Sequence, residues 1–255
     1  MPKRKDEQID GQMSIFDFCV DASNYVSQSN EVISGKQSLS INAAKLLRSA
    51  IMQIKPDDEE LKPYIVTIPE LAKLLNIPRQ DVHRDIDNLT DEIIKNPLYL
   101  KQDKDGVTKW VKIPWVSICK YDSEQGVLIQ LNEQMKPMLL NLIEQGHYTQ
   151  YTLDSILTMK SVYAIRLFEL IQSKIMIKVL PKHGQYIDLS VEEIRQACDC
   201  VDKFQNFSSF RSKVIDRAIK EINEKTMFRI DYPYSDIRKG KSIIGFRFHI
   251  NMMYH

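Results

Sequence analysis

Two stretches of the chain share one pattern: residues 40–54 read SINAAKLLRSAIMQI, and residues 161–175, at an offset of 121, read SVYAIRLFELIQSKI. In both, apolar residues recur at the three- and four-residue spacing of a helix that buries one face. Each stretch opens on a serine, Ser40 or Ser161, whose hydroxyl can cap the first turn. The pattern predicts the same long core helix twice, and therefore an internal duplication.

The segment after each helix repeats as well. A short β-like run precedes Thr67-x-x-Glu70 in the first copy and Ser190-x-x-Glu193 in the second. In this spacing the hydroxyl accepts a hydrogen bond from the backbone amide three residues on, and the Glu carboxylate accepts one from the Thr or Ser amide. Each copy is therefore expected to begin a second helix in the same way.

A third helix is predicted from the pattern Ile-Asp-x-x-x-x-Glu-Ile, which occurs at 86–93 and again at 215–222. Both copies then end in β-like runs around a polar tip. In the first copy these runs are 98–101 and 109–118, with a further run at 127–131. In the second copy the runs are 227–232 and 242–251, on either side of residues 235–241.

Helix, short strand, two helices and a β-hairpin is the order of a winged helix, which is a helix-turn-helix followed by a hairpin wing. The predicted fold class is α+β, with two tandem winged-helix domains related by internal duplication. The first residues are polar and lack periodicity, so they are expected to form a flexible tail. The predicted organisation is a tail at 1–37, a first domain at 38–131 and a second domain at 132–255.

The net charge of +1 hides a strong polarity along the chain. Residues 203–255 carry 11 Lys and Arg against 5 Asp and Glu, so the remainder of the chain is acidic. The third helix of the first copy, at 78–95, has five acids against three bases, and phosphates would repel it. The corresponding helix at 207–225 is basic. We therefore expect the second domain to be the main reader of DNA.

The candidate DNA contacts follow from this polarity. Hydroxyls beside long cations on one helix face suit base reading flanked by phosphate contacts. On a helical wheel the outward side chains of the second copy include Ser209, Ser212, Lys213, Arg217 and Lys220. The tip of its hairpin adds Arg238, Lys239 and Lys241, and in the first copy Lys101, Lys104 and Lys109 are expected to serve a wing in the same way.

Several motifs together resemble the Rep_3 superfamily of plasmid replication initiators, over roughly Ser38 to Ile250. The motifs that carry the resemblance are HYTxYxL at 147–153, KSVYAIRLFEL at 160–170, FxxFRxKVIxxAxxEIN at 207–223, and KGK at 239–241 with IxFxFxI at 244–250. The resemblance adds Ser208 and Arg211 to the recognition helix. Because Arg211 falls within the apolar arc of the wheel, it either contacts DNA or extends from the core as a neighbour of the buried residues.

The resemblance implies a bacterial, cytoplasmic protein that binds repeated sequences (iterons) at a plasmid origin. It implies opening of the adjacent A·T-rich DNA and recruitment of the host initiator and helicase. It also implies that monomers bind the iterons, while homodimers formed through the N-terminal domain repress the protein's own synthesis. Two other classes remain open: a winged-helix transcription regulator or autorepressor that does not melt origins, and a scaffold that binds proteins only.

The predicted tail contains one apolar cluster. Gln12, Met13, Ser14, Ile15 and Phe16 resemble the pentapeptide with which bacterial replication proteins bind the sliding clamp. The alternative is that this cluster packs on the protein's own surface.

No pattern points to an enzyme. The chain lacks the glycine-rich phosphate loops of nucleotide hydrolases, a His-x-His pair and a zinc-site cysteine spacing. We therefore expect no catalysis, no metal and no cofactor. The four cysteines have no disulfide framework spacing, and no apolar run has the length of a membrane span, so a protein of the reducing cytoplasm is expected.

Overall fold

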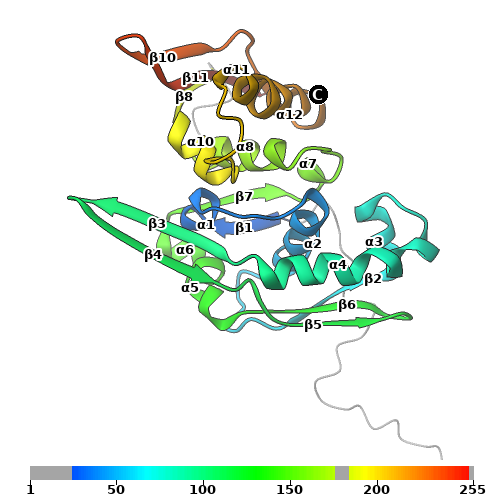
Figure 1. The fold of residues 1–255 in the computed structure, drawn as a ribbon. Helices are drawn as coiled ribbons and strands as arrows, with labels where there is room; N and C mark the ends of the chain where they lie inside the picture. The colour runs from blue at the N-terminus through cyan, green and yellow to red at the C-terminus, as the bar shows by residue number, and fades with distance from the viewer. Residues whose placement is uncertain (1–24, 176–183, 253–255) are drawn as a thin grey trace, which may run out of the picture.

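The computed structural model describes residues 25–175 and 184–252 as two stacked units (Figure 1). The pentapeptide at 12–16 lies outside these residues. The first unit and the segment after it contain β1 (Tyr25–Ser29), α1 (Asn30–Ser34), α2 (Ile41–Ile51), β2 (Pro63–Thr67), α3 (Ile68–Leu75), η2 (Arg79–Asp81), α4 (Val82–Lys95), β3 (Leu98–Lys104), β4 (Val107–Ile113), β5 (Val116–Asp122), β6 (Gly126–Leu131), η3 (Glu133–Met135), α5 (Lys136–Leu139), α6 (Leu142–Gln145), β7 (Tyr148–Thr152) and α7 (Asp154–Leu157).

The second unit begins with the helix that repeats α2. Its elements are α8 (Val162–Gln172), β8 (Gln185–Ser190), α10 (Val191–Ala197), α11 (Phe207–Phe210), the π-helical turn η4 (Arg211–Asp216), α12 (Arg217–Lys225), β9 (Phe228–Ile230), β10 (Ser235–Lys239) and β11 (Ser242–Met252).

Both units have the sheet of a winged helix. In the first, the strand before the helix-turn-helix, β2, pairs with β6, and β6 pairs with β5. In the second, β8 pairs with β11, and β11 pairs with β10 and β9. All these pairs are antiparallel, and the strand order is the same in both units. The predicted pair of winged helices is therefore confirmed.

The wing of the first unit is not where the sequence placed it. The single run expected at 109–118 is broken by Pro114 and the fully buried Trp115 into β4 and β5. Strand β4 pairs only with β3, in a separate two-stranded hairpin. The counterpart of β10–β11 is β5–β6, because that hairpin pairs with the strand before the helix-turn-helix. The assignment of Lys101, Lys104 and Lys109 to an equivalent wing is therefore wrong.

The predicted tail also ends earlier than residue 37. Strand β1 pairs in antiparallel register with β7, from Tyr25 opposite Thr152 to Ser29 opposite Tyr148. Its Val26 and Gln28 are fully buried. The segment lacks a local periodicity because it is ordered by a partner more than a hundred residues away, which a local pattern does not reveal.

The Ile-Asp-x-x-x-x-Glu-Ile repeat has a structural reason. In the first unit the carboxylate of Glu92, on α4, accepts hydrogen bonds from the backbone amide and hydroxyl of Ser40, at the start of α2. In the second unit the carboxylate of Glu221, on α12, accepts from the amides of Lys160 and Ser161, at 2.7 and 3.1 Å, where α8 starts. Each third helix thus caps the first helix of its own unit with a carboxylate, which the helix dipole also favours.

The equivalent helices α2 and α8 meet through equivalent residues. Arg48 of α2 and Glu169 of α8 stand 121 residues apart, which is the offset of the repeat, and both side chains are fully buried. The Arg48 guanidinium donates to the two carboxylate oxygens of Glu169 at 3.0 and 3.1 Å. Arg166, Tyr151 and Gln28 donate to the same carboxylate. A hydrogen-bonded ion cluster centred on Glu169 therefore joins the two units.

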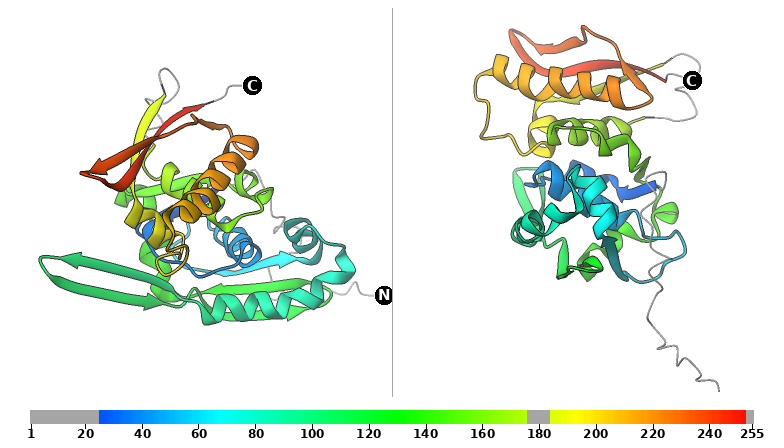
Figure 2. Two further views of the ribbon diagram at one scale, coloured as in Figure 1. Left: turned by 45° about the horizontal axis from the view of Figure 1, so that its top comes forward. Right: turned by 90° about the vertical axis from the view of Figure 1, so that its right-hand side faces the viewer.

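A second pair of equivalent cations completes this near two-fold arrangement. Lys45 of α2 donates to the carbonyls of Leu157 and Met159, at 2.6 and 2.9 Å, just before α8. Arg166 of α8, at the equivalent position, donates to the carbonyls of Ile33 and Gly35, before α2. Each helix thus binds the chain that enters the other, and α8 lies between the first unit and α12 (Figure 2).

This cluster predicts an acid-sensitive contribution to stability. Burial alone would raise the pKa of the Glu169 carboxyl, but the charges of Arg48 and Arg166 outweigh it and lower the pKa to about 2. Because the pKa in the unfolded chain is about 4.3, this contribution is complete above that value and is lost as pH falls towards 2. Urea unfolding of the wild type between pH 6 and pH 2 measures it. In Glu169→Gln the two guanidinium groups lose their counter-charge, which lowers the unfolding free energy at pH 6 by about 3–5 kcal/mol.

The variant also supplies the control for the pH dependence. Glu169→Gln has no carboxyl at this position, so its stability falls less steeply than that of the wild type between pH 4.3 and pH 2. Glu133→Gln, an exposed acid, retains the wild-type dependence. Parallel acid curves for the wild type and Glu169→Gln would contradict the assignment.

Candidate nucleic-acid interface

The third helix of the second unit runs without a break through α11, η4 and α12. It begins at Asn206, whose side chain accepts from the Ser209 amide at 3.1 Å. The inward residues Phe210, Val214, Ile215, Ala218 and Ile222 are all buried. The outward residues Ser208, Ser212, Lys213, Arg217 and Lys220 are exposed, and Ser209 is half-buried.

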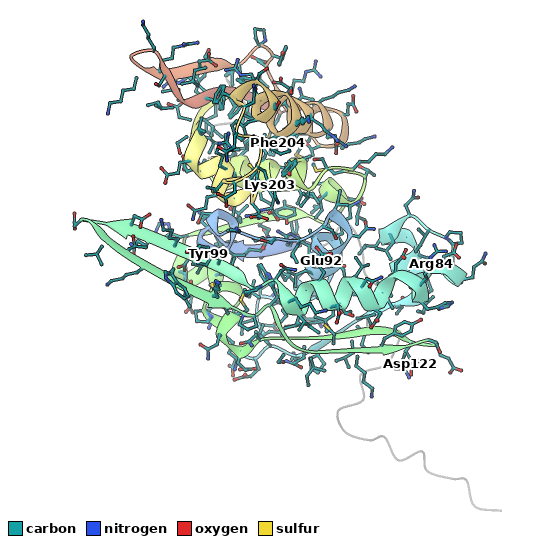
Figure 3. The ribbon with its side chains drawn as sticks, viewed as in Figure 1. Arg84, Glu92, Tyr99, Asp122, Lys203 and Phe204 are labelled. Carbon is teal, nitrogen blue, oxygen red and sulfur yellow. The ribbon has the colours of Figure 1, made fainter. Side chains whose placement is uncertain are left out.

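Arg195, on α10, fixes the turn ahead of this helix. Its guanidinium donates to the carbonyls of Cys200, Lys203 and Phe204 at 2.8, 2.8 and 3.0 Å, and lies 4.1 Å from the centre of the Phe210 ring. Lys203 and Phe204 therefore lie in the turn that immediately precedes the helix (Figure 3). The Lys213 ammonium lies 5.7 Å from the centre of the Phe204 ring, so the same turn supports one of the outward cations.

The outward cations differ in how far they are neutralised. Arg217 lies 3.5 Å from Glu221, and Lys220 lies 4.0 Å from Glu224. Within the described residues, Lys213, Lys239 and Lys241 have no carboxylate partner. Among the cations predicted to contact DNA in this unit, these three lysines are therefore the most available to an anionic ligand.

The wing carries the remaining predicted cations of this unit. Strands β10 and β11 turn at Gly240, where φ is +61°, a conformation that favours glycine. Arg238, Lys239 and Lys241 are exposed around this turn. Arg238 is bound to Asp236 of its own strand at 2.9 Å.

Among the residues predicted to contact DNA, Arg211 is bound to other residues of the protein itself. Its guanidinium is bound to the Asp236 carboxylate on β10, and its side chain is 33% exposed. It also lies 5.2 Å from the centre of the Phe246 ring. The structure shows the contacts with core neighbours, which is one of the two roles that the sequence left open, and the contact of Arg211 with DNA stays a prediction.

The matching surface of the first unit is acidic. Helix α4 exposes Arg84 between Asp81 and Asp85, which lie 4.0 and 3.7 Å from it. The tip of β5–β6 carries Asp122, whose carboxylate accepts hydrogen bonds from two backbone amides of the turn that follows it (Figure 3). The predicted unsuitability of this helix for phosphates agrees with the charges that surround it.

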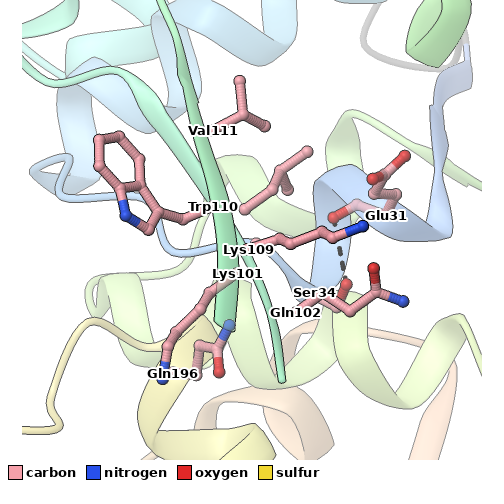
Figure 4. Close-up of a pocket in the computed structure, with 10 residues that line it drawn as sticks. Glu31, Ser34, Lys101, Gln102, Lys109, Trp110, Val111 and Gln196 are labelled. Carbon is pink, nitrogen blue, oxygen red and sulfur yellow. Dashed lines mark hydrogen bonds between the residues drawn. The ribbon is translucent and has the colours of Figure 1, made fainter. Parts of the chain in front are cut away.

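The three lysines predicted in the first unit lie on the β3–β4 hairpin, which projects from the body (Figure 1). Lys101 is bound to Asp103 at 2.6 Å, and Lys109 is exposed. The Lys104 side chain is outside the described part of the structure. Lys101 and Lys109 line an open hollow of about 400 Å³ between the hairpin, α1 and Gln196 of the second unit (Figure 4).

The sequence patterns did not identify three residues that position this surface. Arg195 and Asp236 have no local pattern to mark them, because each acts through a residue more than four positions away. Tyr234 donates to Asp216 at 2.8 Å, which is visible only once the wing is placed beside the helix. Three-dimensional pairing is the signal that identifies all three.

Other kinds of site are not apparent in the described residues. Across 25–175 and 184–252, no three His, Cys, Asp or Glu side chains gather in a way that could hold a metal ion. Within the same residues, no helix has the length and apolar character needed to cross a bilayer.

Comparison with known proteins gives concordant matches. An uncharacterized 27.6 kDa protein of Escherichia coli is 24% identical over 228 residues, which cover 84% of this chain and 91% of that protein. The Pi initiator protein, in a crystal structure with iteron DNA, has the same fold. It superimposes with a TM-score of 0.73 at 19% identity, over 92% of this chain and 100% of that one.

Two family models cover most of the chain. One describes the WH1 domain of the initiator replication protein and matches residues 25–172, which include β1 and extend to the end of α8. The other describes the WH2 domain of the initiator Rep protein and matches residues 190–250. They follow one another in the order of the two winged helices described above. The chain therefore belongs to the family of initiator replication proteins built from the winged-helix domains WH1 and WH2.

Proposed function

We propose that this protein starts plasmid replication by binding repeated duplex sequences, the iterons, at the origin, chiefly through its second winged helix. The observation that carries the proposal is the exposed face of α11–η4–α12, where hydroxyls stand beside Lys213 while the core side is closed by apolar residues. The shared fold with an initiator solved on iteron DNA supports it. In this proposal the protein is not an enzyme: it binds and opens DNA and needs no cofactor.

The side chains of this face fit the two kinds of contact that duplex DNA offers. A recognition helix lies in the major groove, where Ser208 and Ser212 can exchange hydrogen bonds with base edges. Lys213 at its side, and Lys239 and Lys241 on the wing, match the phosphates that border the groove. Wing and helix would therefore bind one duplex together.

The first winged helix has a different part in the proposal. Its acidic α4 does not suit a groove lined by phosphates, so this helix is assigned to contacts with the host initiator and helicase. Lys101 and Lys109 on the projecting hairpin supply phosphate contacts of their own. The sliding clamp would be bound through Gln12–Phe16, outside the described residues.

The proposal is tested on the DNA that flanks the gene. Footprinting is expected to protect a set of repeated sequences, and the neighbouring A·T-rich DNA is expected to become reactive to a single-strand probe when the protein is added. Protection without opening would favour a transcription regulator with the same winged helices. No protection on any duplex would favour a protein-binding scaffold and would overturn the proposal.

The assigned cations give a quantitative prediction. Each of Lys213→Ala and Lys239→Ala is expected to weaken duplex binding, and to reduce the slope of log affinity against log salt concentration by about 0.9, because one phosphate contact is lost. Fluorescence anisotropy over a salt series measures both. Lys55→Ala, at an exposed lysine in the loop after α2, is the matched control and leaves the slope unchanged. An unchanged slope in both test variants would mean that the DNA surface lies elsewhere.

We also propose that the first unit forms a homodimer through β5. This strand is the outer strand of the sheet β2-β6-β5, so in the described chain its far edge has no strand partner. It exposes Ile118 (55%) on the face away from α4, and an unpaired, partly apolar edge favours a second strand. Antiparallel pairing of β5 with its copy would give a closed two-fold dimer.

A charge at this edge is expected to separate the dimer. In Ile118→Glu a carboxylate replaces the apolar side chain beside the pairing edge and loses its hydration when the second strand binds, so sedimentation is expected to show a dissociation constant at least about tenfold higher, which corresponds to about 1.4 kcal/mol. Val107→Glu, at an equally exposed residue (55%) of the β3–β4 hairpin, is the control and retains the wild-type balance. Equal dissociation constants for wild type and Ile118→Glu would exclude β5 as the interface.

A further inference from the structure

One carboxylate stands between the recognition helix and the wing of the second unit. Asp236, on β10, binds the Arg211 guanidinium through one oxygen and the Arg238 guanidinium through the other, at 2.9 Å for Arg238. Asp236 is only 19% exposed, while Arg238 is 54% exposed at the tip of the wing. A single acid therefore neutralises two of the cations that the DNA-binding surface presents.

The π-helical turn is what brings Arg211 to this acid. Residues 211 and 216 point about 140° apart on a regular α-helix. The wider turn η4, in which hydrogen bonds join residues five apart, moves both side chains towards the wing. Arg211 then reaches Asp236, and Asp216 accepts from the Tyr234 hydroxyl at 2.8 Å. Two polar contacts thus join the recognition helix to the strand and loop of the wing: in one the helix residue donates the hydrogen bond, and in the other it accepts.

Aromatic rings enclose the Arg211 guanidinium on the protein side. Its central carbon lies 5.7, 5.6 and 5.2 Å from the ring centres of Phe207, Tyr234 and Phe246. Such cation–π contacts suit the flat guanidinium better than an ammonium group. Rings and a carboxylate together therefore hold the Arg211 guanidinium against the protein.

We propose that Asp236 determines specificity: it fixes the angle between recognition helix and wing through Arg211, and it withholds Arg238 from phosphates that the wing meets at random. Arg238 already has a carboxylate partner, so replacing Asp236 by a phosphate changes the free energy of binding little. Arg238 therefore adds little to the affinity for a duplex of arbitrary sequence. A specific complex still benefits from the fixed angle, which lets helix and wing bind together. This inference rests on the proposed binding of duplex DNA and assigns Arg211 as a positioning residue.

Asp236→Asn is the decisive variant, because it removes the charge and keeps the shape. The probes are the protected repeat from the flanking DNA and a scrambled duplex of the same composition. Freed Arg238 is expected to gain one phosphate contact on the scrambled duplex. The salt slope then steepens by about 0.9, which is up to about eightfold tighter binding at 0.1 M salt. The ratio of specific to scrambled affinity is expected to fall.

A matched control exists on the other face of the same sheet. Asp188, on β8, binds Arg247 of β11 through two hydrogen bonds at 2.7 and 2.6 Å. Asp188→Asn also removes one carboxylate and frees one arginine, but Arg247 alternates with the buried Phe246 and Phe248 and so lies on the face opposite the recognition helix. Its salt slope on the scrambled duplex is expected to equal that of the wild type.

Arg211→Gln separates positioning from phosphate contact. It is expected to weaken binding to the repeat while leaving the salt slope on the scrambled duplex unchanged, with urea midpoints recorded for each variant.

The outcomes discriminate between explanations. A parallel loss of both affinities in Asp236→Asn, or no change in either, would overturn the inference while leaving the proposed function intact. Failure of the wild type to prefer the repeat over the scrambled duplex would overturn the proposed function itself.

Discussion

The carboxylate of Glu169 is the point on which the arrangement of the two winged helices depends. A fully buried carboxylate is stable only if opposite charges and hydrogen bonds replace water, and here Arg48 comes from one unit and Arg166 from its own helix. Because Arg48 and Glu169 are equivalent positions of the repeat, the duplicated helices meet across an approximate two-fold axis. Such a cluster adds less to stability than to geometry, since alternative arrangements of the units would leave a charge buried without a partner.

That geometry determines where the acidic and the basic third helix lie relative to one another. Figure 1 shows α4 below the pair β1–β7 and α11–α12 above it. The exposed faces of the two third helices differ in charge: acids surround Arg84 on α4, whereas the helix of the second unit exposes Lys213 beside serines. An even net charge along the chain would have made two similar surfaces. The observed polarity instead makes one helix surface basic, as the proposed function requires, and leaves the other suited to basic or neutral partners.

The parts of the fold that the sequence predicted are those with local causes. The motif at Ser190-x-x-Glu193 forms its capping box, and the repeated Glu of the third helix caps the first helix of its unit. The parts it could not predict depend on distant partners. Strand β1 reads as polar tail because β7 orders it, and the wing of the first unit was misplaced because only strand pairing distinguishes β3–β4 from β5–β6. A wheel drawn at α-helical spacing likewise could not anticipate the π turn that carries Arg211 to Asp236.

Acidic groups near a DNA-binding surface act against binding in general, and that is their value for recognition. A protein that must find a few repeats competes with a large excess of other sequences, so affinity shared by all duplexes is a disadvantage. The acids of α4 make the surface of a whole domain repel phosphates, whereas Asp236 neutralises the single cation Arg238 on the wing. In the proposed function, the acid in both cases removes attraction that carries no sequence information, while Lys213 and the serines beside it, which are exposed, read the groove. The near-neutral total charge of the chain is thus consistent with a protein selected for discrimination between duplexes rather than for tight binding to all of them.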